Sequence, residues 1–210
     1  MTARFVDFAV DPVTLARRLL GQRLVRVLDG ERVAGRIVEV EAYLGVSDRA
    51  AHSRGGHRSA RNESMFCAGG HLYVYFTYGM HWCANVVCGA VDEPVAVLLR
   101  AVEPEEGLES MARRRPKVCR ETDLCSGPAR LAQAFGIDGT LDRIDLRTSN
   151  VMWIERIRRR AVSSRLVVRG PRIGVGYAGD WASRPLRFHL RDNPHVSGPR
   201  RSGGERSGSK

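Results

Sequence analysis

Extended stretches separated by turn signals restrict the fold of this chain more than any other feature of its sequence. Residues 22–28 and 32–43 have the composition of strands, and Asp29-Gly30 between them is a dipeptide typical of two-residue hairpins. Further strands are predicted at 71–77, 82–90 and 94–101. This succession of strands with few helices between them indicates an antiparallel sheet.

Two helices are expected on either side of these strands. Asp11-Pro12 has the form of an N-cap followed by proline in the first helical position, and Gly21 follows the apolar helical face. The second helix is expected to open at Glu103-Pro104 and to end near Arg114.

The stretch CSGPARLAQAFG, residues 125–136, predicts a further helix, with Ser126 as its cap and Gly136 as its terminator. Shorter strands are expected near 151–155, 165–169 and 185–190. Together these elements predict an α+β fold, a single domain with a curved antiparallel β-sheet and surrounding helices. We place this domain at residues 1–191. We expect residues 192–210 to be a basic, disordered tail, because they show no periodicity.

The charge of the chain favours a polyanionic partner. Lys and Arg number 34 against 23 Asp and Glu, a net charge of +11, and the only lysines are Lys117 and Lys210. Arginine binds phosphate through a planar fork and stacks on bases, which suits nucleic acid, although a genome rich in G and C would favour the same composition. The basic clusters at 113–117 and 156–160 could contact phosphates or be solvated helix faces.

Neither a disulfide framework nor a metal site is expected. The five cysteines are an odd number and form no CxxC pair, which favours reduced, mostly buried thiols. His52 and His57 lie five residues apart, but no carboxylate or cysteine stands at ligand spacing beside them. No secretory segment and no long apolar run is present, so we expect a cytoplasmic, bacterial-type protein with no membrane contact and no cofactor.

The strand GRIVEVEAYLG, residues 35–45, places two carboxylates beside a tyrosine. Alternation predicts a core face of Val38, Val40 and Ala42 and a second face of Ile37, Glu39, Glu41 and Tyr43. The second face could be solvated or could line a pocket, and the long polar loop that follows at 45–64 favours a pocket. Arg100, which ends the apolar run VAVLL, could snorkel at a strand end or pair with a pocket carboxylate.

The stretch HLYVYFTYGMHWCAN, residues 71–85, concentrates aromatic rings. Alternation places Leu72, Val74 and Phe76 in the core and Tyr73 and Tyr75 on the other face, as packing or as a cavity wall. Tyr78 falls at the predicted hairpin tip, where a large ring suits insertion into another molecule. Asn85 lies among apolar strand residues and needs hydrogen-bond partners, either structural or in a ligand.

Six blocks occur in a recognisable order: GRIVEVEAYLG, AAHSRGGHRSARNESMF, GHLYVYFTYGMHWCANVV, VLLRAVEPEEGLESM, LCSGPARLAQAFGI and RIGVGYAGDWASRPLRFHL. Together they resemble the 3-methyladenine DNA glycosylase family of the alkyladenine (methylpurine) type. The resemblance spans about residues 12–191 and is weak over 137–165. It implies a monofunctional base-excision repair enzyme that flips a damaged purine out of duplex DNA and hydrolyses its N-glycosidic bond. The implied substrates are 3-methyladenine, 7-methylguanine, hypoxanthine and 1,N6-ethenoadenine.

The resemblance also implies the residues that carry the chemistry. Glu41 would be the general base that activates water, and Arg100 and the backbone carbonyl of Ile173 would help to hold that water. Val40 stands where some relatives have Thr, and we expect little consequence because its side chain falls on the predicted core face.

Binding roles follow from the same resemblance. The residues that would enclose the flipped base are Tyr43, His52 and Tyr75. Asn85 would discriminate against normal guanine, whose 2-amino group would collide with it. Tyr78 would fill the gap left in the base stack, and Met80 beside it would contact the DNA.

Elementary chemistry agrees with these implied roles. Aromatic rings stack on a flipped base and attract cationic alkylated purines. One positioned carboxylate can deprotonate water and stabilise a positively charged sugar. A lyase would need an amine to form a Schiff base, but Lys117 lies in a surface basic cluster and Lys210 is the last residue. We therefore expect no strand nicking.

Two alternatives remain open at the level of sequence. A nucleic-acid-binding module without catalysis would explain the charge and the rings, but it leaves Glu41 beside Tyr43 unexplained. A nucleoside hydrolase could use the same glutamate, although a neutral substrate needs no surface charge of +11. We favour a monomer that acts on double-stranded DNA containing alkylated or deaminated purines.

Overall fold

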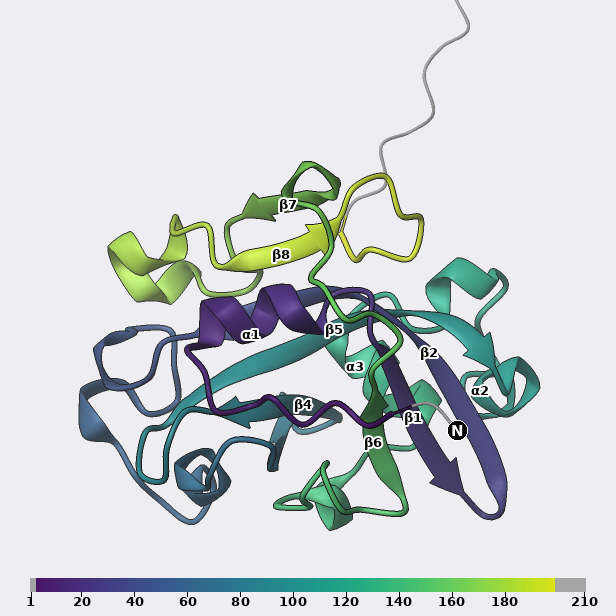
Figure 1. Ribbon diagram of the computed structural model, residues 1–210, viewed down its shortest axis with the longest axis horizontal. Coiled ribbons are helices and arrows are strands. Elements are labelled where there is room, and N and C mark those ends of the chain that lie inside the picture. The colour runs from purple at the N-terminus through teal and green to yellow at the C-terminus, as the bar shows by residue number, and fades with distance from the viewer. Residues whose placement is uncertain (1–2, 199–210) are drawn as a thin grey trace, which may run out of the picture.

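The computed structural model describes residues 3–198, in which eight strands form one curved sheet flanked by helices (Figure 1). The strands are β1 (Arg23–Leu28), β2 (Glu31–Tyr43), β3 (Leu72–Thr77), β4 (His81–Cys88), β5 (Val95–Glu106), β6 (Met152–Glu155), β7 (Val167–Gly170) and β8 (Arg187–Leu190). The α-helices of the described part are α1 (Pro12–Leu19), α2 (Leu108–Arg114) and α3 (Pro128–Phe135).

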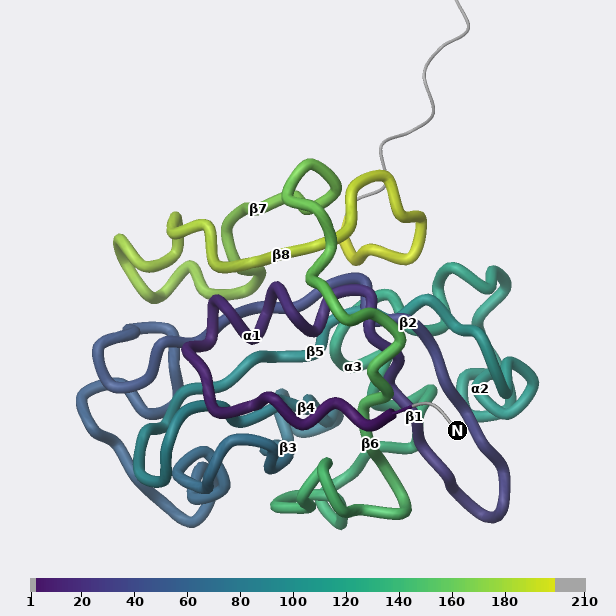
Figure 2. Tube along the Cα trace, viewed as in Figure 1, coloured from purple at the N-terminus to yellow at the C-terminus, as the bar shows by residue number. Residues whose placement is uncertain are grey.

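All strand pairings are antiparallel, in the order β3-β4-β5-β2-β1-β6. β8 pairs with both β2 and β7, and the β7–β8 pair lies to one side of the main sheet, above α1 in Figure 2. The predicted α+β fold with a curved antiparallel sheet is therefore confirmed. Residues 39–41 of β2 lie between β5 and β8, which encloses this part of the strand on both edges.

Two tight hairpins form where the turn signals predicted them. Asp29 and Gly30 have φ values of 52° and 77°, and both must be positive in a type I′ turn. The turn from β3 to β4 is one residue longer, Tyr78 to Met80, and Tyr78 and Gly79 in it also have positive φ values of 52° and 65°. Positive φ is uncommon outside glycine, and here it leaves the Tyr78 ring 82% exposed at the hairpin tip.

The first helix begins and ends as predicted. The Asp11 carboxylate accepts a 2.9 Å hydrogen bond from the Thr14 amide, and Pro12 occupies the first helical position. α1 buries Leu15 and Leu19 against the sheet and gives way to Gly21, whose φ is 78°.

The predicted start of the second helix at Glu103-Pro104 is wrong. β5 continues through Pro104 to Glu106, and α2 begins only after Gly107. Proline is tolerated there because Pro104 lies opposite Gly35 at a register shift between β2 and β5. The two strands approach so closely that a Cβ atom on Gly35 would collide with the Glu103 backbone.

The predicted capping of α3 by Ser126 is also wrong. Gly127 is the N-cap residue and α3 begins at Pro128, without a side-chain cap. The Ser126 hydroxyl instead accepts a hydrogen bond from Arg130. The terminator is confirmed, because Gly136 adopts the left-handed conformation.

The sheet has a core face, packed against α1, α2 and α3, and an opposite face. β2 contributes Ile37, Val40 and Ala42 to the core face. The predicted position of Ile37 beside the carboxylates is wrong, because the pairing of β2 with β5 shifts between Ile37 and Glu39. Val38 is the extra residue of this bulge, so the side chains before it point to the opposite faces from those that simple alternation predicts. Val38 itself is buried but lies outside the main core cluster.

The core prediction for β3 is correct for Leu72 and Val74 and wrong for Phe76. Phe76 is 42% exposed, because β3 extends beyond the helices near the hairpin tip. Its ring packs on Trp82 of the paired strand, with the ring centroids 4.8 Å apart.

The long polar loop at 45–64 contains short 3-10 turns and packs against the opposite face of the sheet, at the left of Figure 1. The first part of the predicted disordered tail, residues 192–198, is described by the structure and contacts the sheet. Asn193 donates to Glu103, and Ser197 contacts Glu39. Residues 199–210 lie outside the described residues, and the domain boundary at 191 stays a prediction.

Cys83, Cys88 and Cys125 are buried, whereas Cys67 is half-buried and Cys119 exposed. Burial raises the pKa of Cys125 to about 12, which keeps this thiol protonated. Within residues 3–198, none of the helices has the length and apolarity needed to cross a membrane.

Candidate active site

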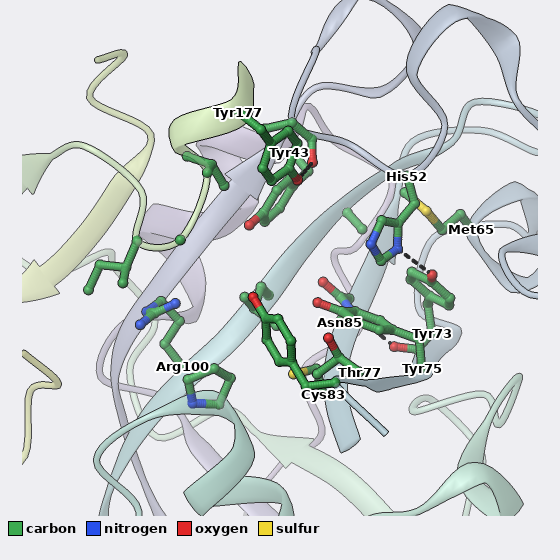
Figure 3. Close-up of a pocket in the computed structure, with 18 residues that line it drawn as sticks. Tyr43, His52, Met65, Tyr73, Tyr75, Thr77, Cys83, Asn85, Arg100 and Tyr177 are labelled. Carbon is green, nitrogen blue, oxygen red and sulfur yellow. Dashed lines mark hydrogen bonds between the residues drawn. The ribbon is translucent and has the colours of Figure 1, made fainter. Parts of the chain in front are cut away.

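A cavity of about 260 Å³ opens on the face of the sheet opposite the helical core (Figure 3). Its walls come from β2 to β5, the 45–66 loop, the first residue of α3 and the loop at 173–177. The predicted site residues in the lining are Tyr43, His52, Tyr75, Tyr78, Asn85, Arg100 and Ile173. The remaining two lie elsewhere: Glu41 is fully buried behind the lining, and Met80 is 67% exposed on the hairpin.

The Glu41 carboxylate touches three groups of the cavity wall. One oxygen, Oε1, accepts a 2.8 Å hydrogen bond from the Ile173 amide and lies 3.2 Å from Nη1 of Arg100. The other, Oε2, accepts a 3.0 Å hydrogen bond from the Tyr43 hydroxyl. A carboxylate has about four lone-pair sites, so these contacts leave acceptor capacity for a water molecule.

Burial shifts the pKa values of both Glu41 and Tyr43. Loss of hydration raises the pKa of Glu41, although the Arg100 charge and the hydrogen bonds from Ile173 and Tyr43 oppose that shift. Burial and the neighbouring carboxylate also raise the pKa of Tyr43 well above its ordinary value. Tyr43 therefore stays protonated and donates to Glu41, which orients the carboxylate toward the cavity.

The second carboxylate of β2, Glu39, is fully buried in an arginine-rich setting. Its Oε1 accepts hydrogen bonds from Nε of Arg100 at 2.9 Å and from Nε of Arg187 at 2.6 Å. Burial alone would raise the pKa of Glu39, but the two guanidinium groups and the Ser197 amide outweigh it and hold this pKa below the ordinary value. The solvated alternative for this strand face is thus excluded.

Arg100 reaches both carboxylates because of an irregularity in β5. Glu39 pairs with Ala101 and Val40 with Leu99, so Arg100 is the extra residue of a bulge. Its side chain is buried and paired with carboxylates, which decides against a snorkelling strand end.

A buried ion pair fixes the two loops that meet at Tyr43. Arg172 binds Asp48 through two hydrogen bonds of 2.5 and 2.8 Å, and both side chains are fully buried. The Arg172 guanidinium also lies 4.6 Å from the centroid of the Tyr43 ring. The pair thereby holds the amide of the next residue, Ile173, against Glu41.

The opposite wall consists of stacked polar rings. His52 Nδ1 lies 2.7 Å from the Tyr73 hydroxyl, and the His52 ring meets Tyr75 edge-on with centroids 4.5 Å apart. Burial, together with nearby Arg61 and His57, lowers the pKa of His52 to about 4, so this ring is neutral at pH 7. In Figure 3 these rings lie to the right of the cavity, with Tyr43 and Tyr177 above it.

Asn85 closes the floor between these walls. It pairs with Tyr73 across β3 and β4, and its Nδ2 donates a 3.2 Å hydrogen bond to the Tyr73 carbonyl. The side chain is 5% exposed and lines the cavity, so it has both a structural bond and a position facing a ligand.

The family described as methylpurine-DNA glycosylase matches residues 6–194 of this chain, which include every residue of the cavity wall. The chain belongs to the methylpurine-DNA glycosylase family.

Individual relatives agree with this membership. The DNA-3-methyladenine glycosylase of Mus musculus is 48% identical over 88% of this chain, and that of Homo sapiens is 47% identical over 94%. A Burkholderia lata relative is 48% identical over 84% of this chain and 82% of its own length. The chain spans 58% of the length of the mouse protein and 68% of the human one.

Several contacts of this methylpurine-DNA glycosylase family member were not predicted from its sequence. The residues in question are Asp48, Tyr73, Arg172, Tyr177, Arg187 and Ser197. Tyr73 was left between packing and pocket lining, and it does both, since it is 1% exposed and lines the cavity. The RIGVGYAGDW block contained Arg172 and Tyr177, but only their packing against 48–50 shows their position.

Metal ligands do not assemble in the part of the chain that the structure describes. Within residues 3–198, no three His, Cys, Asp or Glu side chains are grouped so that they could hold an ion.

Proposed function

We propose that this protein excises alkylated and deaminated purines from double-stranded DNA by hydrolysing their N-glycosidic bond. The observation that carries the proposal is a buried carboxylate, Glu41, held at the wall of an aromatic cavity by Tyr43, Ile173 and Arg100. Pockets for drug-sized ligands measure roughly 300–1,000 Å³, so a cavity of about 260 Å³ suits a single base.

Glu41 is the general base in this proposal. It removes a proton from water while the water oxygen forms a bond to C1′ of the sugar, and the electrons of the C1′–N bond leave with the purine. A purine methylated at N3 or N7 is cationic in DNA and so departs as a neutral base, whereas hypoxanthine and ethenoadenine are neutral and must take up a proton as they leave. Arg100 and the Ile173 carbonyl would hold the water, whereas the Ile173 amide is already bonded to Glu41.

The flipped base would stack between Tyr43 on one wall and His52 and Tyr75 on the other. Base–aromatic stacking is worth about 1–3 kcal/mol per base, which offsets the unpairing cost of flipping. Neutral His52 adds no charge that would repel a cationic purine. Asn85, fixed by its bond to Tyr73, would disfavour guanine, whose 2-amino group would collide with it, whereas the positive charge of 7-methylguanine would offset the same collision by its attraction to the rings.

Duplex DNA would bind on the hairpin side of the cavity. Tyr78 would enter the gap left by the flipped nucleotide, and the exposed Met80 would contact the neighbouring bases. The net charge of +11 supports a polyanionic partner. We further propose that the protein acts as a monomer in a bacterial-type cytoplasm, on nucleoid DNA.

No lyase step is proposed, because the lysine among residues 3–198, Lys117, is not placed to attack the sugar. Lys117 lies after α2 and outside the cavity lining, and Lys210 lies outside the described residues. Borohydride trapping of a covalent adduct with an abasic duplex would contradict this part of the proposal.

The central test is base release from a duplex carrying one hypoxanthine or ethenoadenine, under single-turnover conditions. Removing a general base costs about 10²–10⁴-fold in rate, so Glu41→Gln should bind the duplex but release the base at least a hundredfold more slowly. Glu109→Gln, an exposed glutamate on α2, is the matched control and should behave as wild type.

The same assay separates the alternatives. Full activity of Glu41→Gln would overturn the mechanism. Binding without base release by the wild-type protein would favour a non-catalytic module, and turnover of free nucleosides would favour a nucleoside hydrolase.

A further inference from the structure

Ser197, in the segment after β8, uses its amide and hydroxyl at the buried carboxylate Glu39 and its carbonyl at Arg187. Its amide donates to Glu39 Oε2 at 2.7 Å, and its hydroxyl donates to Glu39 Oε1 at 2.9 Å. Its carbonyl accepts a 2.8 Å hydrogen bond from Nη2 of Arg187. Four hydrogen bonds therefore converge on Glu39, two from the arginines and two from this serine.

The same hydroxyl also reaches Arg100. Nη2 of Arg100 donates to Ser197 Oγ at 3.2 Å, while Nε binds Glu39 and Nη1 lies 3.2 Å from Glu41. Each nitrogen of this guanidinium thus has one partner. Because the group is planar, the contacts to Glu39 and Ser197 determine where Nη1 points.

The charges of this buried cluster balance, with two glutamates against Arg100 and Arg187. Isolated buried charges are costly, whereas a neutral cluster with satisfied hydrogen bonds can hold a fixed geometry. The segment that supplies Ser197 is itself anchored upstream, where Asn193 donates to Glu103 at 2.8 Å. In Figure 2 this segment is the yellow loop that follows β8.

We propose that Ser197 is a positioning residue: together with Glu39 it fixes the Arg100 guanidinium against Glu41. This inference rests on the proposed function, since it assigns Ser197 to the support of the same general base. Ser197 does not itself line the cavity and makes no hydrogen bond to Glu41, so it acts only through Arg100 and Glu39.

The test is the single-turnover rate of base release from an ethenoadenine duplex by full-length variants. Ser197→Ala removes the hydroxyl and leaves the amide, and a hydrogen bond to a charged group is lost at both Glu39 and Arg100. We expect the rate to fall about tenfold, with the dissociation constant for the duplex unchanged. Ser197→Thr retains the hydroxyl and should restore a rate close to that of wild type.

Two further variants separate positioning from a general loss of structure. Ser164→Ala removes an exposed serine in the 3-10 turn before β7 and should release base at the wild-type rate. In Glu39→Gln the Ser197 hydroxyl loses its charged acceptor and keeps only the contact with Arg100, so adding Ser197→Ala should slow the reaction less than it does in the wild type. Independent, multiplied losses in the double variant would overturn the proposal.

The outcome also distinguishes this inference from the function on which it depends. A wild-type rate in Ser197→Ala, alongside an inactive Glu41→Gln, would overturn only the role of Ser197. An equal loss in Ser197→Ala and Ser197→Thr would also overturn it, because the hydroxyl would then be irrelevant. Full activity in Glu41→Gln would instead overturn the proposed function.

Discussion

At the scale of single residues, the two glutamates of β2 show how position decides chemistry. Both are fully buried and two residues apart, yet their pKa values move in opposite directions. Glu39 has two guanidinium partners and an amide, which outweigh its burial. Glu41 has one guanidinium partner, Arg100, and burial prevails there over this charge and the hydrogen bonds from Ile173 and Tyr43, so its carboxyl holds a proton more strongly than an ordinary glutamate does.

The raised pKa of Glu41 predicts an acidic limb in the rate of base release. Below this pKa the carboxyl is protonated and cannot accept a proton from water, so the rate should fall as the pH falls. Because burial raises the pKa, the midpoint should lie above the ordinary glutamate value of about 4.3. Single-turnover rates on a duplex with 7-methylguanine measure it, since that leaving group is already cationic.

His52 should contribute little to this limb, because a pKa of about 4 leaves most of its rings neutral down to pH 4.5. The exposed-site variant Glu109→Gln should keep the limb unchanged. A rate that stays flat down to pH 4.5 would show that Glu41 is not the titrating base.

At the scale of elements, the strands of the β3–β4 hairpin contribute to the core, whereas its turn carries a residue proposed to contact DNA. Its inner residues Leu72 and Val74 are core, whereas its turn presents Tyr78 on a backbone with positive φ. The turn has only three residues between the paired Thr77 and His81, which keeps the exposed ring close to the cavity that it helps to line.

Tyr78→Ala should therefore leave the free energy of unfolding within about 0.5 kcal/mol of wild type, because the ring is 82% exposed. It should slow base release from duplex DNA about tenfold or more, since nothing then fills the gap in the stack. Denaturant unfolding and single-turnover rates measure the two effects. The same lesion in single-stranded DNA is the control: an equal slowing there would contradict a role in filling the gap.

At the scale of the whole molecule, the arginines divide between the two faces of the sheet. Arg158, Arg159 and Arg160 border a separate cavity with Arg18 of α1, which packs on the core face. Arg61 instead lies on the side of the active-site cavity, with its guanidinium 6.0 Å from the centroid of the Tyr75 ring.

DNA affinity should depend on Arg61, on the side of the active-site cavity, and not on Arg158, Arg159 and Arg160. Arg61→Gln should weaken binding to an abasic duplex and reduce the slope of log affinity against log salt by about 1. Replacing Arg158, Arg159 and Arg160 together by Gln should leave that slope unchanged. A loss of slope in the triple variant would place DNA on the α1 side of the sheet and contradict this orientation.

The parts of this protein that its sequence determined are those with local causes. Alternation located the strands, positive-φ dipeptides located the hairpins, and the Asp11-Pro12 cap located α1, because each depends on neighbouring residues only. The six blocks were enough to name the family, which the match over residues 6–194 confirms.

The tertiary structure alone decided the contacts that hold the site together. Bulges in β2 and β5 moved Ile37 into the core and turned Arg100 toward both glutamates, and no local pattern marks an extra residue in a strand. The partners of Glu39 come from β5, β8 and the segment that follows it, more than 60 residues away along the chain. A buried charge needs compensation wherever the fold can supply it, and the fold supplied it from segments distant in sequence.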